Sequence, residues 1–252
     1  MKLHIENNKS ALGIAAATSG AARIRATLQE KGQATLVVAT GASQFGMLDA
    51  LVKQQDIDWS KITIFHLDEY LGLPASHPAS FQRYLRERLI NRVAPVKAFI
   101  GIDGTAEVAE EIARLNHLIR QHDIDLCFAG IGENCHLAFN DPPADFQLQE
   151  PYHRVKLDEQ CRQQQLGEGW FDTLDDVPQY AISMSIQQIA RAKCIILSVP
   201  DSRKASAVAA AVAGPISAMY PASWLQQHPN CSLYLEPESA SLLPRPLSDG
   251  AL

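Results

Sequence analysis

The sequence of 252 residues has no long apolar run and no closely spaced cysteine pair. No stretch of about 18 apolar residues is available to cross a bilayer, and Met1 to Glu6 do not begin an apolar signal segment. The five cysteines are odd in number and never arranged as CxxC, which disfavours a disulfide framework and a zinc site. We therefore expect a cytoplasmic protein with reduced thiols, no bound metal and no contact with membranes.

An excess of positive charge is also missing. The chain carries 28 acidic and 22 basic residues, which gives a net charge of −6 and a pI of about 5.7. Such a chain offers no broad positive field, so we expect no nucleic-acid partner. A small anion needs only a local pocket, so a phosphorylated small molecule stays compatible with this charge.

No Ser/Gly-rich linker, internal repeat or low-complexity tract divides the chain. Hydrophobic residues make up 46% and charged residues 20%, which is ordinary for a globular protein with a sizeable core. We expect a single domain over residues 1–252, with fraying in the tail from Pro244 to Leu252.

Strand-length apolar runs alternate with longer helical segments, which is typical of βαβ units and a mostly parallel sheet. The predicted strands are 35–39, 62–65, 98–100, 124–129, 180–184, 194–199 and 232–235. The predicted helices are 10–31, 44–54, 79–92, 106–122 and 202–213, the last capped by Asp201 or Ser202.

Four polar segments directly follow predicted strands, at 40–43, 66–70, 130–136 and 200–204. In an open parallel sheet the carboxyl ends of the strands form one rim, and ligands bind in the crevice there. The sequence therefore predicts that these four segments build one site.

The second of these segments contains the acidic pair Asp68 and Glu69. Adjacent residues in extended chain point in opposite directions, so only one carboxylate is expected to face the crevice. A buried carboxylate there could remove a proton from a carbon next to a carbonyl or imine. The alternative is a solvated acidic turn.

The third segment contains His136, followed by Asp141. A neutral imidazole held by Asp141 could move protons between sugar oxygens. The alternative is a loop histidine that only satisfies a backbone carbonyl.

The same segment does not support a dinucleotide cofactor. Gly130-x-Gly132-x-x-Cys135 lacks the third glycine of the fingerprint, and the prolines at 142 and 143 block the helix that would carry the pyrophosphate. We expect no NAD and no other cofactor.

Two positions suit a phosphate group. Gly41 stands just before a predicted helix and Lys204 lies in the first turn of another, where free backbone N–H groups are available. The hydroxyls of Ser43 and Ser202 strengthen this interpretation. A lysine in a helix is also commonly solvated, so Lys204 alone is weak evidence for a phosphate site.

Two longer motifs resemble the glucosamine-6-phosphate deaminases. Residues 67–80 read LDEYLGLPASHPAS, similar to the acidic segment of that family, and residues 130–142 read GIGENCHLAFNDP, similar to its second signature. Thr40-Gly41 and Lys204-Ala205 extend the likeness from about residue 35 to about residue 237. The superfamily also includes the 6-phosphogluconolactonases.

The resemblance implies an α/β fold, a modified Rossmann-like three-layer sandwich with a mostly parallel central sheet. It implies an enzyme that opens the pyranose ring, isomerises aldose to ketose and releases ammonia, giving fructose 6-phosphate. By position, Asp68 would move the proton between C2 and C1, and His136 would open the ring, oriented by Asp141. Asn134 is a further catalytic candidate, and the substrate-binding candidates are Gly41, Ala42, Ser43, Glu69, Lys204 and Arg162.

The chain departs from the family pattern at several positions. The deaminases usually have Asp at position 134, Gly at 135 and Glu at 141, where this chain has Asn134, Cys135 and Asp141. Cys135 replaces a residue that tolerates positive φ, so we expect a reshaped or strained turn.

The family also places an arginine at the position of Gly169, just before an aromatic pair. We expect Arg162 to supply the missing cation. Alternatively, Arg162 lies on a solvated helix face.

Two other functions are compatible with these motifs. A 6-phosphogluconolactonase would use a similar histidine for hydrolysis, although the lactonases differ after His136 and at Tyr70. A sugar-phosphate sensor would explain the departures, although a sensor needs no base such as Asp68. The sequence leaves a homo-oligomer possible.

Overall fold

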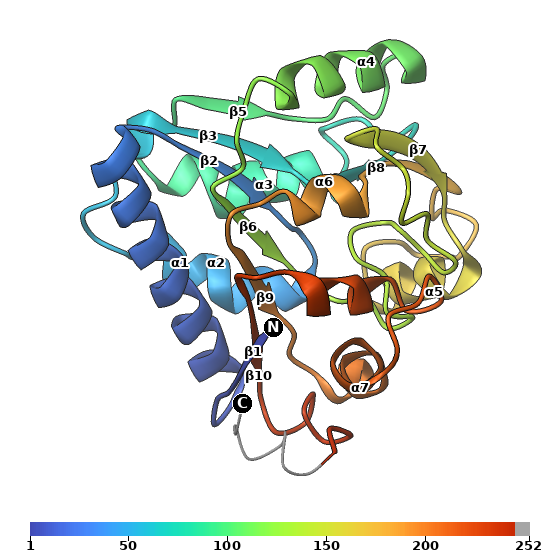
Figure 1. The fold of residues 1–252 in the computed structure, drawn as a ribbon. Helices are drawn as coiled ribbons and strands as arrows, with labels where there is room; N and C mark the ends of the chain where they lie inside the picture. The colour runs from blue at the N-terminus through green and yellow to red at the C-terminus, as the bar shows by residue number, and fades with distance from the viewer. Residues whose placement is uncertain (245–252) are drawn as a thin grey trace.

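The computed structural model describes residues 1–244, and its centre is a seven-stranded sheet between two layers of helices (Figure 1). The strand order is β1-β10-β9-β6-β2-β3-β5, and every neighbouring pair is parallel. The strands are β1 (Lys2–Ile5), β2 (Ala34–Val38), β3 (Ile62–His66), β5 (Ala98–Ile100), β6 (Leu126–Ala129), β9 (Ile195–Ser198) and β10 (Cys231–Leu235). The predicted α/β three-layer sandwich with a mostly parallel sheet is confirmed.

The central strands β2, β6 and β9 are buried along their whole length because both faces of the sheet are covered. Alternate side chains of β2 enter different cores: Leu36 and Val38 pack in one hydrophobic cluster, and Val37 packs in the other.

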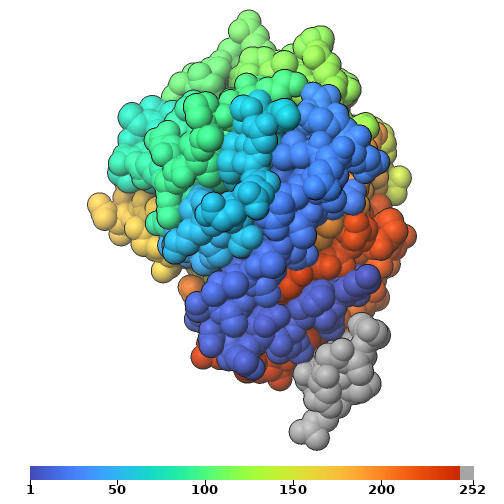
Figure 2. Space-filling view, turned by 90° about the vertical axis from the view of Figure 1, so that its left-hand side faces the viewer, coloured from blue at the N-terminus to red at the C-terminus, as the bar shows by residue number. Residues whose placement is uncertain are grey.

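Three helices cover one face of the sheet, and Figure 2 shows that the blue-to-green part of the chain forms most of the surface on this side of the molecule. They are α1 (Lys9–Lys31), α2 (Phe45–Leu51) and α3 (Phe81–Arg88). The side chain of Asn8 caps the start of α1, and Gly32, at φ 70°, ends it. The opposite face is covered by α4 (Val108–Ile119), α6 (Ile186–Ala190) and α7 (Ala205–Ala213).

A second sheet of three antiparallel strands lies beside the carboxyl ends of the large sheet. Its order is β4-β8-β7, with β4 (Asp68–Tyr70), β8 (Tyr180–Met184) and β7 (Tyr152–Lys156). The predicted strand at 180–184 is present with those bounds, but it pairs in this sheet and not in the parallel one. The sequence analysis missed β1, β4 and β7. Strand β7 carries the exposed charged residues Arg154 and Lys156, so it lacks the apolar run by which the other strands were predicted.

The predicted helix at 10–31 is present as α1, and the other four are shorter than expected, three of them because they begin or end as 3-10 turns. The 3-10 segments are η1 (Ala42–Gln44), η2 (Trp59–Lys61), η3 (Ile90–Arg92), η4 (Ser202–Lys204) and η5 (Pro221–Gln227). Helix α5 (Glu159–Gly167) and α6 were not predicted. The side chain of Asp201 caps η4 by accepting from Arg203 N, as expected.

Within residues 1–244, no helix combines the length and apolarity needed to span a membrane. The tail for which fraying was expected lies, beyond Pro244, outside the described residues.

Candidate active site

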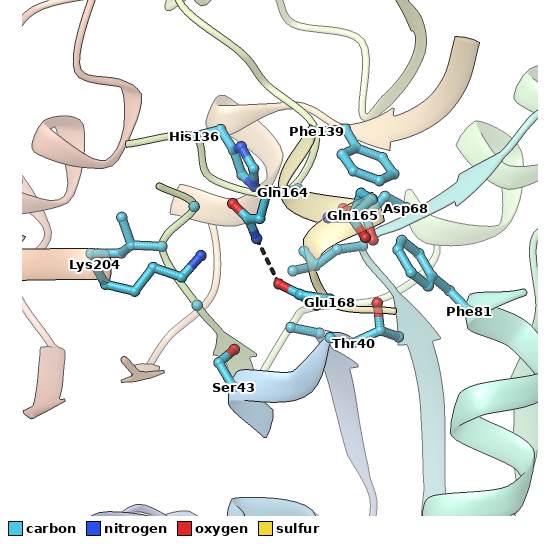
Figure 3. A pocket seen from close by; sticks show the side chains of 17 residues that line it. Thr40, Ser43, Asp68, Phe81, His136, Phe139, Gln164, Gln165, Glu168 and Lys204 are labelled. Carbon is cyan, nitrogen blue, oxygen red and sulfur yellow. Dashed lines mark hydrogen bonds between the residues drawn. The ribbon is translucent and has the colours of Figure 1, made fainter. Parts of the chain in front are cut away.

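One pocket of about 510 Å³ opens at the carboxyl ends of the parallel strands (Figure 3). The four predicted polar segments all contribute to it, because β2, β3, β6 and β9 end on the same side of the sheet. Its polar lining residues include Thr40, Ser43, Asp68, His136, Gln164, Gln165, Glu168 and Lys204, and Phe81 and Phe139 supply an aromatic wall.

Asp68 is the acidic residue that faces the pocket. It begins β4, directly after β3, and is 7% exposed. No described residue donates a hydrogen bond to its carboxylate, and burial together with the charge of Glu69 raises its pKa to about 8. A carboxyl group with this pKa is a stronger base than a solvated one and can both accept and return a proton near neutral pH.

Glu69 points the other way and is tied to the start of α3. Its carboxylate accepts hydrogen bonds from Ser80 Oγ at 2.8 Å, Phe81 N at 3.0 Å and Gln82 N at 2.8 Å. Burial raises the pKa of Glu69 to about 7, and these hydrogen bonds oppose the rise. Since Glu69 is 1% exposed and does not line the pocket, the structure does not bring this predicted substrate-binding residue to the site.

His136 lines the pocket and is connected to Asp141 and Asn134, which do not line it. His136 Nδ1 lies 3.3 Å from Asp141 Oδ1, without a well-aligned hydrogen bond. The amide of Asn134 donates to Asp141 Oδ1 at 3.0 Å, and Asp158 N donates to Asp141 Oδ2 at 2.9 Å. Burial would raise the pKa of Asp141, but the imidazole and these donors bring it below its ordinary value. Asp141 is therefore placed to orient the imidazole of His136.

Asn134 keeps a role that does not need ionisation. Its amide also donates to Asp158 Oδ2 at 2.9 Å, and its Oδ1 accepts from His136 N at 3.1 Å. Asn134 therefore fixes the loop that carries His136 and does not line the pocket itself.

The backbone around His136 is tightly constrained. A Cβ on Gly132 would lie 2.2–2.4 Å from ring atoms of His136, so the imidazole keeps this position only with glycine at 132. Cys135 has φ 69°, in the left-handed region that favours glycine, so the expected strained conformation is confirmed.

The predicted phosphate residues meet at the other end of the pocket. Gly41, at φ 94°, turns the chain after β2, and Gly41, Ser43 and Lys204 line the pocket. Lys204 is 4% exposed, and burial lowers its pKa. Its neighbour Arg203 pairs with Asp201 and Glu133, whereas the side-chain amine of Lys204 has no ion pair or hydrogen bond with any residue from 1 to 244.

The predicted substrate-binding residue Ala42 does not line the pocket, and its backbone N–H lies 3.4 Å from Glu168 Oε2. Arg162 lies elsewhere: its guanidinium donates to the carbonyl oxygens of Leu174 and Val177 and does not line the pocket. Because α5 has about 3.6 residues per turn, Arg162 lies roughly half a turn from Gln164, which does face the pocket.

Helix α5 supplies residues that the sequence analysis missed. Gln164 Nε2 donates to Glu168 Oε1 at 2.8 Å, and Gln165 Oε1 accepts from Tyr70 Oη at 2.8 Å. The run of three glutamines from 163 to 165 was a signal for polar lining residues in this segment, where only Arg162 was predicted to contribute.

One group of side chains could hold a metal ion by distance. Ligand atoms of His136, Asp141 and Cys161 all lie within 4.8 Å of one another, and such a donor set suits zinc. Both oxygens of Asp141 already accept hydrogen bonds, so we assign the group to orienting His136.

Residues 7–233 match the family described as glucosamine-6-phosphate isomerases/6-phosphogluconolactonase. The chain is 38% identical over 221 residues to a glucosamine-6-phosphate deaminase of Streptococcus pneumoniae, covering 86% of this chain and 92% of that protein. A solved structure of a monomeric glucosamine-6-phosphate deaminase has a TM-score of 0.88 and 32% identity, covering 96% of this chain and 100% of that one. A 6-phosphogluconolactonase from Trypanosoma brucei has a TM-score of 0.80 at 16% identity, covering 96% of this chain and 98% of that one, a likeness in fold alone.

The family match runs through both sequence motifs and through every strand that lines the pocket. The deaminase relative covers most of the chain at an identity well above that of the lactonase structure. The chain therefore belongs to the glucosamine-6-phosphate isomerase/6-phosphogluconolactonase family.

Proposed function

We propose that this protein converts glucosamine 6-phosphate to fructose 6-phosphate and ammonia. The observation that carries the proposal is one pocket with an unpaired carboxylate, Asp68, an imidazole, His136, and a buried unpaired ammonium, Lys204. The first two groups suit proton transfer and the third suits a phosphate. The 38% identity to a glucosamine-6-phosphate deaminase supports the same assignment.

The chemistry begins with ring opening. His136, oriented by Asp141, moves the proton between the ring oxygen and the C1 hydroxyl, which gives the open aldehyde. Asp68 then removes the C2 proton while the carbonyl oxygen at C1 takes up a proton from solvent, which forms an enolamine. Asp68 returns its proton to C1, and the amino group gives up one proton to solvent as the C2 imine forms. The resulting C2 imine takes up water and releases ammonia, which leaves the ketone of fructose 6-phosphate. The protons taken by Asp68 and His136 are returned, so both groups end as they began.

The phosphate occupies the end of the pocket formed by the 41–43 turn and Lys204. A dianion in an acidic protein needs local compensation, and backbone N–H groups provide only partial charge. The ammonium of Lys204 provides a full charge without first breaking an ion pair. Asp68 and His136 lie on the other side of the pocket from Ser43 (Figure 3), which supports a pose in which C1 and C2 face these two groups.

The test is incubation of the purified protein with glucosamine 6-phosphate, measuring ammonium and fructose 6-phosphate together. We expect equal amounts of both, and loss of both in Asp68→Asn and His136→Ala. Hydrolysis of 6-phosphogluconolactone without ammonium release would assign the chain to the lactonases instead. Binding without turnover would make it a sugar-phosphate sensor.

The same proposal includes a cytoplasmic location. All five cysteines are buried and unpaired, which suits a reducing compartment. Fractionation of the native cells, with immunodetection of the chain, tests this part.

A further inference from the structure

The C-terminal end of α5 places a carboxylate over the phosphate end of the pocket. Glu168 Oε2 lies 3.4 Å from Ala42 N and 3.2 Å from Trp170 Nε1, and its Oε1 accepts from Gln164 Nε2 at 2.8 Å. An ideal Cβ on Gly41 would lie 3.8 Å from Oε2, so the carboxylate lies against the turn that follows β2. Figure 3 shows the ends of Glu168, Lys204 and Ser43 around the same space.

Lys204 identifies this space as a place for an anion. Its side chain is buried, lines the same pocket and has no ion pair or hydrogen bond with any described residue. Of the neighbouring charges that raise the pKa of Lys204, Glu168 is the largest, although burial dominates and lowers it. The amine therefore has Glu168 nearby as a counter-charge, but not as a close partner.

We propose that Glu168 is a specificity-determining residue that occupies the phosphate position with its own carboxylate until the substrate phosphate displaces it. This inference rests on the proposed function for the identity of the substrate. A phosphate and this carboxylate cannot share the position, because one ammonium and the N–H groups of one turn would face three negative charges.

Substrate binding therefore moves Glu168 and the end of α5 away from the turn at Ala42. The movement breaks the hydrogen bond from Trp170 Nε1, whose ring packs edge-on to Phe45 and Tyr84. A dianion that accepts several hydrogen bonds can replace the carboxylate, whereas an uncharged sugar cannot. Glu168 thus makes the pocket select for phosphorylated ligands.

The test compares inorganic phosphate binding to the wild type, Glu168→Gln and Glu159→Gln by isothermal titration calorimetry. Glutamine keeps the size of the side chain and removes the competing charge, so we expect the Kd to fall roughly tenfold or more in Glu168→Gln. Glu159 lies exposed on the same helix and does not line this pocket, so Glu159→Gln makes the same charge change and is expected to keep the wild-type Kd.

A second readout is Trp170 fluorescence. Saturating phosphate should change the emission of the wild type, and the change should be absent in Trp170→Phe. An unchanged or weaker phosphate affinity in Glu168→Gln, or no emission change at saturation, would overturn the inference. Neither measurement depends on turnover, so a protein that releases no ammonium but meets both expectations would contradict only the proposed function.

Discussion

Two adjacent carboxyl groups, Asp68 and Glu69, are both buried, but they face different surroundings and have different hydrogen-bond partners. Glu69 accepts bonds from α3, whereas Asp68 accepts none from the described residues and has a pKa raised to about 8. A base must be ionised to act, so activity is lost as the pH falls through that value. We expect kcat/KM for glucosamine 6-phosphate to drop roughly tenfold per pH unit below about 8.

The variant Glu69→Gln tests whether Asp68 causes the fall of kcat/KM at low pH. The charge of Glu69 contributes to the raised pKa of Asp68, so its removal should move the limb to lower pH. Ionisation of the substrate amine would leave the limb in place in this variant. A midpoint that does not move would remove Asp68 as the titrating group.

Gly132 is the residue that leaves room for His136. Its Cβ in Gly132→Ala would lie 2.2–2.4 Å from the imidazole ring, so the ring must shift. Since a misplacement of about 1 Å can cost 10²-fold, we expect kcat/KM to fall by about that factor with the fold retained. Gly167→Ala is the control, because nothing lies within 4 Å of its Cβ. Full activity in Gly132→Ala would show that the position of His136 is not critical.

At the scale of elements, β4 and α3 are joined through Glu69. Its carboxylate accepts from the backbone N–H groups that begin α3, so Glu69→Gln leaves at least one of them without an acceptor. We expect the free energy of unfolding, measured in urea, to fall by about 1.5–3 kcal/mol. Glu87→Gln, exposed on the same helix and paired with Arg83, should change it by less than about 0.5 kcal/mol. Equal effects of the two substitutions would refute the anchoring role.

At the scale of the whole molecule, Lys204 couples ligand binding to stability. Removing a buried, unpaired ammonium in Lys204→Met should leave the unliganded protein as stable or more stable. The same change should weaken the binding of glucosamine 6-phosphate by about 10- to 100-fold.

Thermal unfolding with ligand checks this coupling. At a ligand concentration of about 100 times the wild-type Kd, binding should stabilise the wild type by about 2.7 kcal/mol and a variant with 100-fold weaker affinity by about 0.4 kcal/mol. Arg203→Met removes a neighbouring exposed cation and should behave like the wild type. Equal ligand stabilisation of both variants would contradict the phosphate role of Lys204.

The sequence by itself determined the parallel sheet and the rim on which the site lies. Mostly apolar strands such as β2 and β6 can be predicted from the local sequence, because a strand covered on both faces has no polar side. The polar segments containing Asp68, His136 and Lys204 could be placed together because parallel strands end at one edge. The expected single domain and the oligomeric state stay predictions.

Only the tertiary structure decided which of these side chains enter the pocket. Asp68 and Glu69 are equivalent in the sequence, and the choice between them depends on pairing of β4 with β8 and on the N–H groups of α3, which are distant in the chain. Arg162 was predicted to supply the cation that Gly169 lacks. The helical phase of α5 instead directs its guanidinium to the carbonyl oxygens of Leu174 and Val177 and brings Glu168 to the site. Helical phase relative to a pocket depends on how a helix packs, and packing depends on contacts that no local pattern contains.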